Sequence, residues 1–197
     1  MKQGALSFSD VRRVRDSPAF VFSLAFLLCG LLAGSFTGMH IPQNDGTYMN
    51  SLAELLTQSP AMLSWKTVLS CIGCVAAWPL AAVILGSGPG RGLWIALLIA
   101  IRGFLLSFAV AAILQQSGLR GIYLSAATTG VMSLFALPAL LLLASAALMA
   151  GQSAGRNGYW KGLRQYTGTM AVSLLLLLAA ALWRLFVTPM LLSIVGI

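Results

Sequence analysis

The residues that could perform chemistry are few in this chain: three cysteines, one histidine and four carboxylates. Cys71 and Cys74 have the spacing of a thiol redox pair, but they lie in an apolar run with no strand before it, so we interpret them as small helix-packing residues. His40 has no cluster of metal ligands around it, and we interpret it as a loop histidine. We therefore expect no metal site and no cofactor.

The four carboxylates are divided between two sides of the first apolar run. Asp10 and Asp16 precede that run, whereas Asp45 and Glu54 follow it. General acid–base catalysis needs titratable groups within reach of one substrate, and a pair split by a membrane span cannot meet this need. We expect a protein that is not an enzyme.

Arg102 is the most informative charged residue. It lies about nine residues, or ~14 Å, into an apolar run, and a charge at such depth is a functional-site hypothesis by default. Its partner could be backbone carbonyls near Pro138, a lipid phosphate or another subunit. Alternatively, the span begins later and Arg102 lies near the inner interface.

Composition indicates the elements that must position these residues. Hydrophobic residues make up 59% of the chain and charged residues 8%, and the mean hydropathy is +0.91. These values are typical of a polytopic membrane protein, so we predict an all-α transmembrane bundle that forms one integral membrane domain over residues 1–197. The predicted spans are about 19–39, 67–85, 93–114, 121–150 and 169–187.

The net charge of +8 is better explained by membrane topology than by nucleic acid, because no aromatic-basic stripe accompanies the basic residues. Residues 121–155 carry no charge at all, a run too long for one straight span and short for two. Splitting this run into a hairpin of two spans would place Arg156, Lys161 and Arg164 on the outer side, whereas basic residues are enriched on the inner side of membrane proteins. We therefore predict five spans with the N-terminus inside, and a fourth span that is kinked at Pro138 or partly re-entrant.

The first apolar run follows Ser17-Pro18, a favourable helix start, and its length favours a retained anchor over a cleaved signal. Gly30, Gly34 and Gly38 share one face of this helix and allow another helix to approach closely. We favour a partner helix within the chain; a second copy, and hence a homo-oligomer, is the alternative.

The largest predicted extramembrane segment spans residues 40–66 on the outer side and contains an interrupted apolar surface that ends near Trp65. It is either a docking surface for an extracytoplasmic partner or a connector that rests on membrane lipids, with Trp65 at the interface. Arg120 lies in a predicted short outer loop. We include Trp65 and Arg120 among the candidate structural or partner-contact residues, with Arg102, Gly103, Pro138 and the three glycines of the first span.

Three stretches resemble the stage II sporulation protein M family: IRGFLLSF at 101–108, LQQSGLRG at 114–121 and LPA at 137–139. The resemblance covers about residues 20–150. It implies a multi-pass protein of the bacterial cell membrane, in the mother-cell membrane at the sporulation septum. It also implies a non-enzymatic scaffold for two membrane-anchored peptidoglycan-remodelling enzymes, the stage II sporulation proteins D and P, during engulfment.

A second hypothesis is a permease-like subunit of a membrane transporter. A kinked fourth span beside Arg102 could line a path for an anionic substrate. Against it, the sequence has no internal repeat, no acidic proton relay and no matched pair of broken spans. We favour the scaffold.

Overall fold

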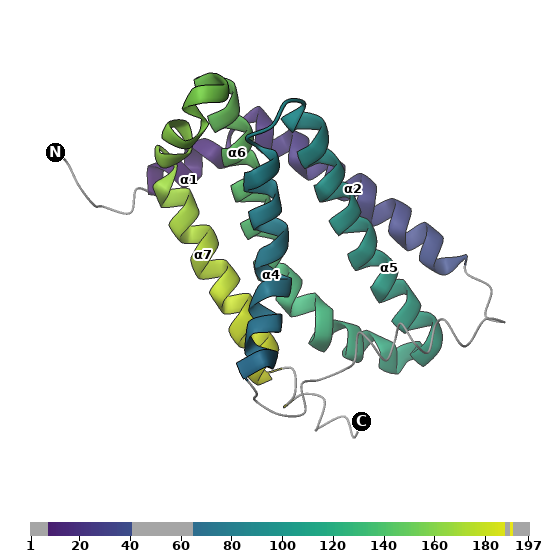
Figure 1. Ribbon diagram of the computed structural model, residues 1–197. Helices are drawn as coiled ribbons and strands as arrows, with labels where there is room; N and C mark the ends of the chain where they lie inside the picture. Colours follow the sequence, from purple (N-terminus) through teal and green to yellow (C-terminus); the bar gives the residue numbers. More distant parts are fainter. Residues whose placement is uncertain (1–7, 41–64, 188–189, 191–197) are drawn as a thin grey trace.

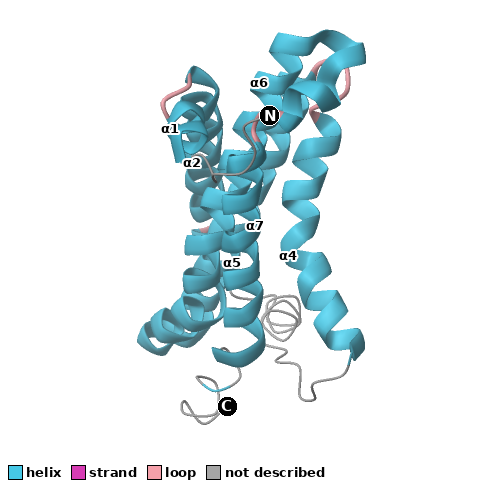
Figure 2. Ribbon diagram, turned by 90° about the vertical axis from the view of Figure 1, so that its left-hand side faces the viewer, coloured by secondary structure: helices cyan, strands magenta, loops and turns pink. Residues whose placement is uncertain are grey.

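The structure is a computed structural model that describes residues 8–40, 65–187 and 190 (Figures 1 and 2). Within these residues the regular elements are all helical. They follow in the order α1 (Phe8–Arg15), α2 (Pro18–Met39), α4 (Trp65–Leu85), α5 (Arg91–Ser125), the π-helical segment η1 (Ala126–Gly130), α6 (Val131–Arg164), α7 (Thr167–Leu182) and the π-helical segment η2 (Trp183–Val187). The predicted all-α class is confirmed.

Four helical stretches are long and apolar enough to cross a membrane: Pro18–Met39, Arg91–Gln115, Val131–Gln152 and Thr167–Val187. They correspond to the first, third, fourth and fifth predicted spans. The second predicted span coincides with α4, which has 21 residues and whose described apolar portion is Val75–Leu85. The multi-helix membrane character is thus supported, while the count of five spans stays a prediction.

The start of α2 follows from its first residues. Ser17 has an extended backbone, and its hydroxyl accepts a hydrogen bond from the Phe20 amide at 3.3 Å. Pro18 occupies the first helical position, where a missing N–H costs nothing. The predicted start at Ser17-Pro18 is therefore confirmed. The short helix α1 just before it was not predicted; it is anchored by Val14, which is fully buried against α6.

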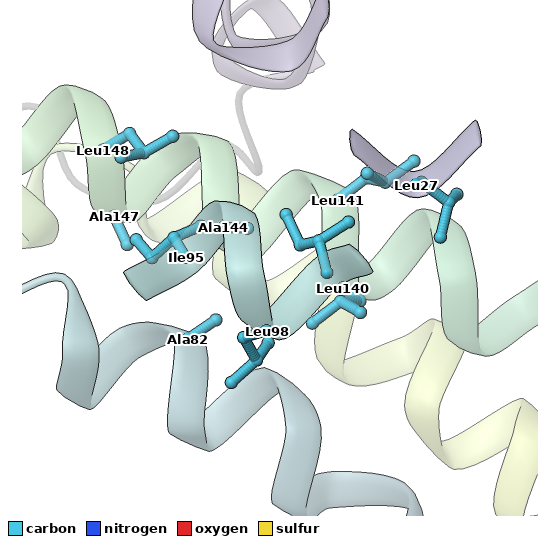
Figure 3. Close-up of a cluster of buried hydrophobic side chains, with 10 residues drawn as sticks. Leu27, Ala82, Ile95, Leu98, Leu140, Leu141, Ala144, Ala147 and Leu148 are labelled. Atoms are coloured by element: carbon cyan, nitrogen blue, oxygen red, sulfur yellow. The ribbon is translucent and has the colours of Figure 1, made fainter. Parts of the chain in front are cut away.

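Helix α6 lies at the centre of the bundle. Its apolar stretch is 72% buried, compared with 22% for those of α2 and α7, so most other helices pack around it. Figure 3 shows one core cluster in which four helices meet. Its buried residues are Leu27, Ala82, Ile95, Leu98, Ile99, Leu140, Leu141, Ala144, Ala147 and Leu148.

The junction between the third and fourth predicted spans differs from the expectation. The predicted end of the third span near 114 agrees with the candidate crossing, which ends at Gln115, but the predicted loop at Arg120 is wrong, because α5 continues as helix to Ser125. The helix can continue through Gly118 and Gly121, because a glycine lowers helix stability by only about 1 kcal/mol. A proline, in contrast, would remove a backbone hydrogen-bond donor. The departure from α-helical geometry comes later, in η1. Pro138 lies inside α6, and a kink there stays a prediction.

Several basic residues gather at one end of the bundle, where α1, the α4–α5 turn and the end of α6 lie (Figure 1). Here the Tyr159 hydroxyl donates to the Val83 carbonyl at 2.7 Å, joining α6 to α4. Burial raises the pKa of this phenol, and the nearby Arg91 opposes the shift. Arg91 itself lies against Gly151 of α6. The turn and α6 are thereby held together at this end.

Candidate functional site around Arg102

A seam of small residues between α2 and α5 sets the position of Arg102. A side chain at Gly30 would collide with the Ala100 carbonyl, and one at Gly34 would meet the Phe104 carbonyl. Residue numbers rise together along both helices, so the two helices are parallel. Within the described residues the partner of the glycine face is α5 of the same chain, the kind of partner that we favoured from the sequence.

The α5 side of the seam also uses small residues. A Cβ at Gly103 would lie 2.7 Å from the Leu27 carbonyl oxygen, so this glycine is needed for the same close approach. At the far end, the Gln115 side-chain amide donates to the Met39 carbonyl at 2.8 Å and joins the ends of the two helices. Gly103 is thus a structural residue next to Arg102.

The face of α5 opposite the seam carries Arg102. This residue is the twelfth of the 25-residue candidate span, so it lies about 16 Å from the start of that span. Its guanidinium carbon lies over the Trp78 ring of α4, 5.3 Å from the ring centroid. The depth of Arg102 in the membrane, and with it the alternative of a position near the inner interface, stays a prediction.

Arg102 is one of the residues that line a cavity of about 310 Å³. Most of its described lining comes from one face of α5, because positions 102, 105, 106, 109 and 112 follow the helical repeat. Thr129 contributes from η1, a type of segment that is frequent at functional sites. The lining residues are Arg102, Leu105, Leu106, Phe108, Ala109, Ala112 and Thr129.

The electrostatics of this site depend on Arg102. A cation at the middle of a membrane helix costs about 2.5–3.5 kcal/mol on insertion scales. A desolvated cation–π contact returns up to about 2 kcal/mol, so Trp78 offsets much of this cost. Arg102 therefore brings a formal positive charge to this face of α5. The contact with Trp78 thus holds the Arg102 side chain of α5 against α4.

The other residues singled out in the sequence do not join this site. Trp65 begins α4, and Arg120 lies within α5, but their side chains are outside the described part of the structure. Pro138 is exposed on α6. The His40 ring lies against Phe36, with Nδ1 2.9 Å from the Phe36 carbonyl oxygen.

The remaining predictions concern metals and thiols. Cys71 and Cys74 lie in α4, with side chains outside the description. Among the described residues, no group of three or more His, Cys, Asp or Glu could hold a metal ion. The segment 41–64, which carries most of the proposed outer docking surface, also lies outside the described residues.

The sequence reasoning missed Trp78 and Pro79. A tryptophan in the middle of an apolar run is unusual, because this residue is enriched at the membrane interface, and this was the available signal. Pro79 lies inside α4 as Pro138 lies inside α6.

Comparisons with protein-family models, curated proteins and solved structures give no match for this chain.

Proposed function

We propose that the protein crosses the bacterial cell membrane five times, with its basic end inside. The α4 helix supports the fifth crossing, because 21 residues span about 31 Å. The charge distribution supports the orientation, since most of the described basic residues lie at the end of the bundle formed by α1, the start of α5 and the end of α6. The basic residues assigned to the inner end are Arg12, Arg13, Arg15, Arg91, Lys161 and Arg164.

Within this membrane the protein acts as a non-enzymatic scaffold. The observation that carries this proposal is the α2–α5 pair: the glycine seam fixes one side of α2, and the other side is open. Helices associate in lipid by packing and not by hydrophobic burial, so a fixed apolar helix offers a ready surface for a partner's membrane anchor. The exposed large residues of α2 are Val21, Phe22, Leu24, Phe26, Leu28, Leu32, Phe36 and Met39.

The family resemblance supplies the partners. They are the membrane-anchored peptidoglycan-remodelling enzymes of engulfment, the stage II sporulation proteins D and P, and the site of action is the mother-cell membrane at the sporulation septum. On this proposal α2 receives an anchor helix from such an enzyme. The surrounding lipids cover the apolar surface that remains.

Co-isolation from detergent-solubilised membranes tests the scaffold. The tagged protein should retain the two enzymes, and the double variant Leu32→Ala, Phe36→Ala should recover about tenfold less of them, as expected for a loss of ~1.4 kcal/mol. These two side chains are 72% and 67% exposed.

The matched control is Leu174→Ala, Leu178→Ala on the exposed side of α7. Equal recovery with both double variants would remove α2 as the docking surface. Failure of the native protein to retain either enzyme would contradict the scaffold itself.

A permease-like subunit is the second candidate, and the cavity at Arg102 favours it. Pro79 and Pro138 lie inside two helices that pack against each other, and each proline removes a backbone donor from its helix. Co-isolation of a nucleotide-binding subunit, or solute flux into vesicles that contain the protein, would support transport over scaffolding.

A further inference from the structure

We infer that the cavity at the α4–α5 turn binds the head group of an anionic phospholipid, whose phosphate lies on the Arg91 guanidinium. This surface cavity of about 470 Å³ is lined by residues 87–93. The binding does not rest on the proposed scaffold function. Three observations carry the inference: the charge of Arg91 has no acidic partner, α6 holds its side chain in place, and the turn lies at the end of a candidate crossing.

The helices around Arg91 supply no carboxylate to balance its charge. The four carboxylates of the protein are Asp10, Asp16, Asp45 and Glu54, so α4, α5, α6 and α7 contain none. In the described part of the structure the Arg91 guanidinium forms no ion pair and no hydrogen bond. Its five N–H donors form a planar fork that matches phosphate oxygens. These donors are therefore available to an anion from outside the bundle.

Helix α6 fixes the position of this guanidinium. A Cβ added at Gly151 would lie 2.6 Å from the Arg91 Cδ and 2.9 Å from its Nε, so the arginine crosses α6 where a glycine leaves room. The Arg91 side chain is partly buried there. A side chain that is already held loses less conformational entropy when it binds a ligand. The other described basic residues at this end are all exposed: Arg12, Arg13, Arg15, Lys161 and Arg164.

The turn lies at the level expected for lipid head groups. Arg91 is the first residue of the candidate crossing Arg91–Gln115. Trp94, one helical turn further on, and Trp160, near the end of α6, both expose large parts of their rings. Exposed tryptophans are enriched at the boundary between lipid and water. Leu93 lines the cavity and is 73% exposed, so an acyl chain can continue from the cavity along α5.

A phospholipid matches this surface better than a free anion does. Basic pockets between membrane helices attract anionic head groups, and the basic residues of this end strengthen that attraction. A lipid also gains apolar contact at Leu93, which inorganic phosphate does not. The cavity lies within the ~300–1,000 Å³ range of ligand pockets, enough for a head group while the acyl chains stay in the bilayer.

Equilibrium binding of radiolabelled dioleoylphosphatidylglycerol to the full-length protein in nonionic detergent tests this inference. The unlabelled competitors are the same lipid, dioleoylphosphatidylcholine and inorganic phosphate. We expect phosphatidylcholine to need about tenfold more than phosphatidylglycerol, because its choline cation opposes the arginine. Inorganic phosphate at the same concentration should displace no lipid.

Two variants alter the site in different ways. Arg91→Gln removes the charge and should weaken phosphatidylglycerol binding about tenfold, the effect of a lost charge-assisted hydrogen bond. Gly151→Ala keeps the charge but displaces the guanidinium, because the new methyl group would occupy the place of the Arg91 side chain. The displaced group is the end of a flexible side chain, so the helices can stay packed. This variant should weaken binding about threefold or more.

The matched control is Arg13→Gln, which makes the same change of charge at an exposed residue of α1. It should weaken binding less than about twofold, because salt screens exposed charges. Equal losses from Arg91→Gln and Arg13→Gln would show general attraction to the basic end and overturn the site.

Equal competition by phosphatidylcholine and phosphatidylglycerol in the native protein would also overturn the inference. Displacement by inorganic phosphate at the lipid concentration would identify a free anion as the ligand and contradict the lipid. Because the competition experiment uses the native chain, it decides the question even if a variant does not fold. None of these results bears on recovery of the peptidoglycan enzymes, which tests the scaffold separately.

Discussion

Gly34→Ala is expected to lower the free energy of unfolding by about 2–3 kcal/mol, the upper part of the range for overpacked cores. The added methyl group would collide with the Phe104 carbonyl and the Ser107 hydroxyl of α5. Backbone atoms cannot move away without separating the helices, and the Ser107 hydroxyl is itself bonded to the Gly103 carbonyl at 3.1 Å. Thermal unfolding in nonionic detergent, followed by tryptophan fluorescence, measures the effect.

The matched control is Gly73→Ala in α4. A Cβ at Gly73 would meet nothing within 4 Å, so this variant only removes the helical cost of a glycine and should gain up to about 1 kcal/mol. The two substitutions are chemically identical, but they are expected to change the free energy of unfolding in opposite directions. A gain in stability from Gly34→Ala would contradict the close packing of α2 on α5.

Tyr159→Ala is expected to cost about 3–5 kcal/mol, as large-to-small changes of buried aromatic residues do. The side chain is only 2% exposed, it packs with Val83, Leu143 and Leu163, and its hydroxyl is bonded to the Val83 carbonyl. The neighbouring Trp160→Ala should cost less than half as much, because that side chain is 63% exposed. Equal losses from the two variants would contradict the burial of Tyr159.

Tyr159→Phe isolates the hydroxyl and should cost about 1 kcal/mol below pH 9. Because burial raises the pKa of the folded phenol above its ordinary value near 10, the native protein keeps this contribution below that pH. The contribution is lost as the pH rises through the raised pKa. The phenylalanine variant should lack this alkaline loss, and an identical pH profile for both proteins would contradict it.

Features encoded by neighbouring residues could be predicted from the sequence. The start of α2 follows from Ser17-Pro18, because the Ser17 hydroxyl caps the first turn and the proline ring fixes the backbone angle φ of the first helical residue. The face used for close packing follows from the spacing of Gly30, Gly34 and Gly38, because a helix repeats every 3.6 residues. The partner of that face could be favoured but not identified, because small residues are common along several spans.

Features that depend on tertiary contacts were missed. The length of α5 was underestimated because glycines mark both turns and close helix contacts, and at Arg120 the helix continues. The sequence of α1 looks like a basic tail, and its order comes from the packing of Val14 and Val11 against α6 and α7. The contact between Arg102 and Trp78 joins residues 24 positions apart, and no local pattern indicates which helices will meet.

The orientation and the number of crossings decide which surfaces a partner can reach. Labelling of single cysteines in intact cells by a membrane-impermeant maleimide measures both, in a protein whose native cysteines are replaced by alanine. The three positions are Arg13→Cys, Lys161→Cys and Met190→Cys, all at exposed residues outside the candidate crossings. Five crossings with the basic end inside predict labelling at 190 only, with 13 and 161 labelled after permeabilisation. Labelling of 161 but not 190 in intact cells would show four crossings and contradict the account.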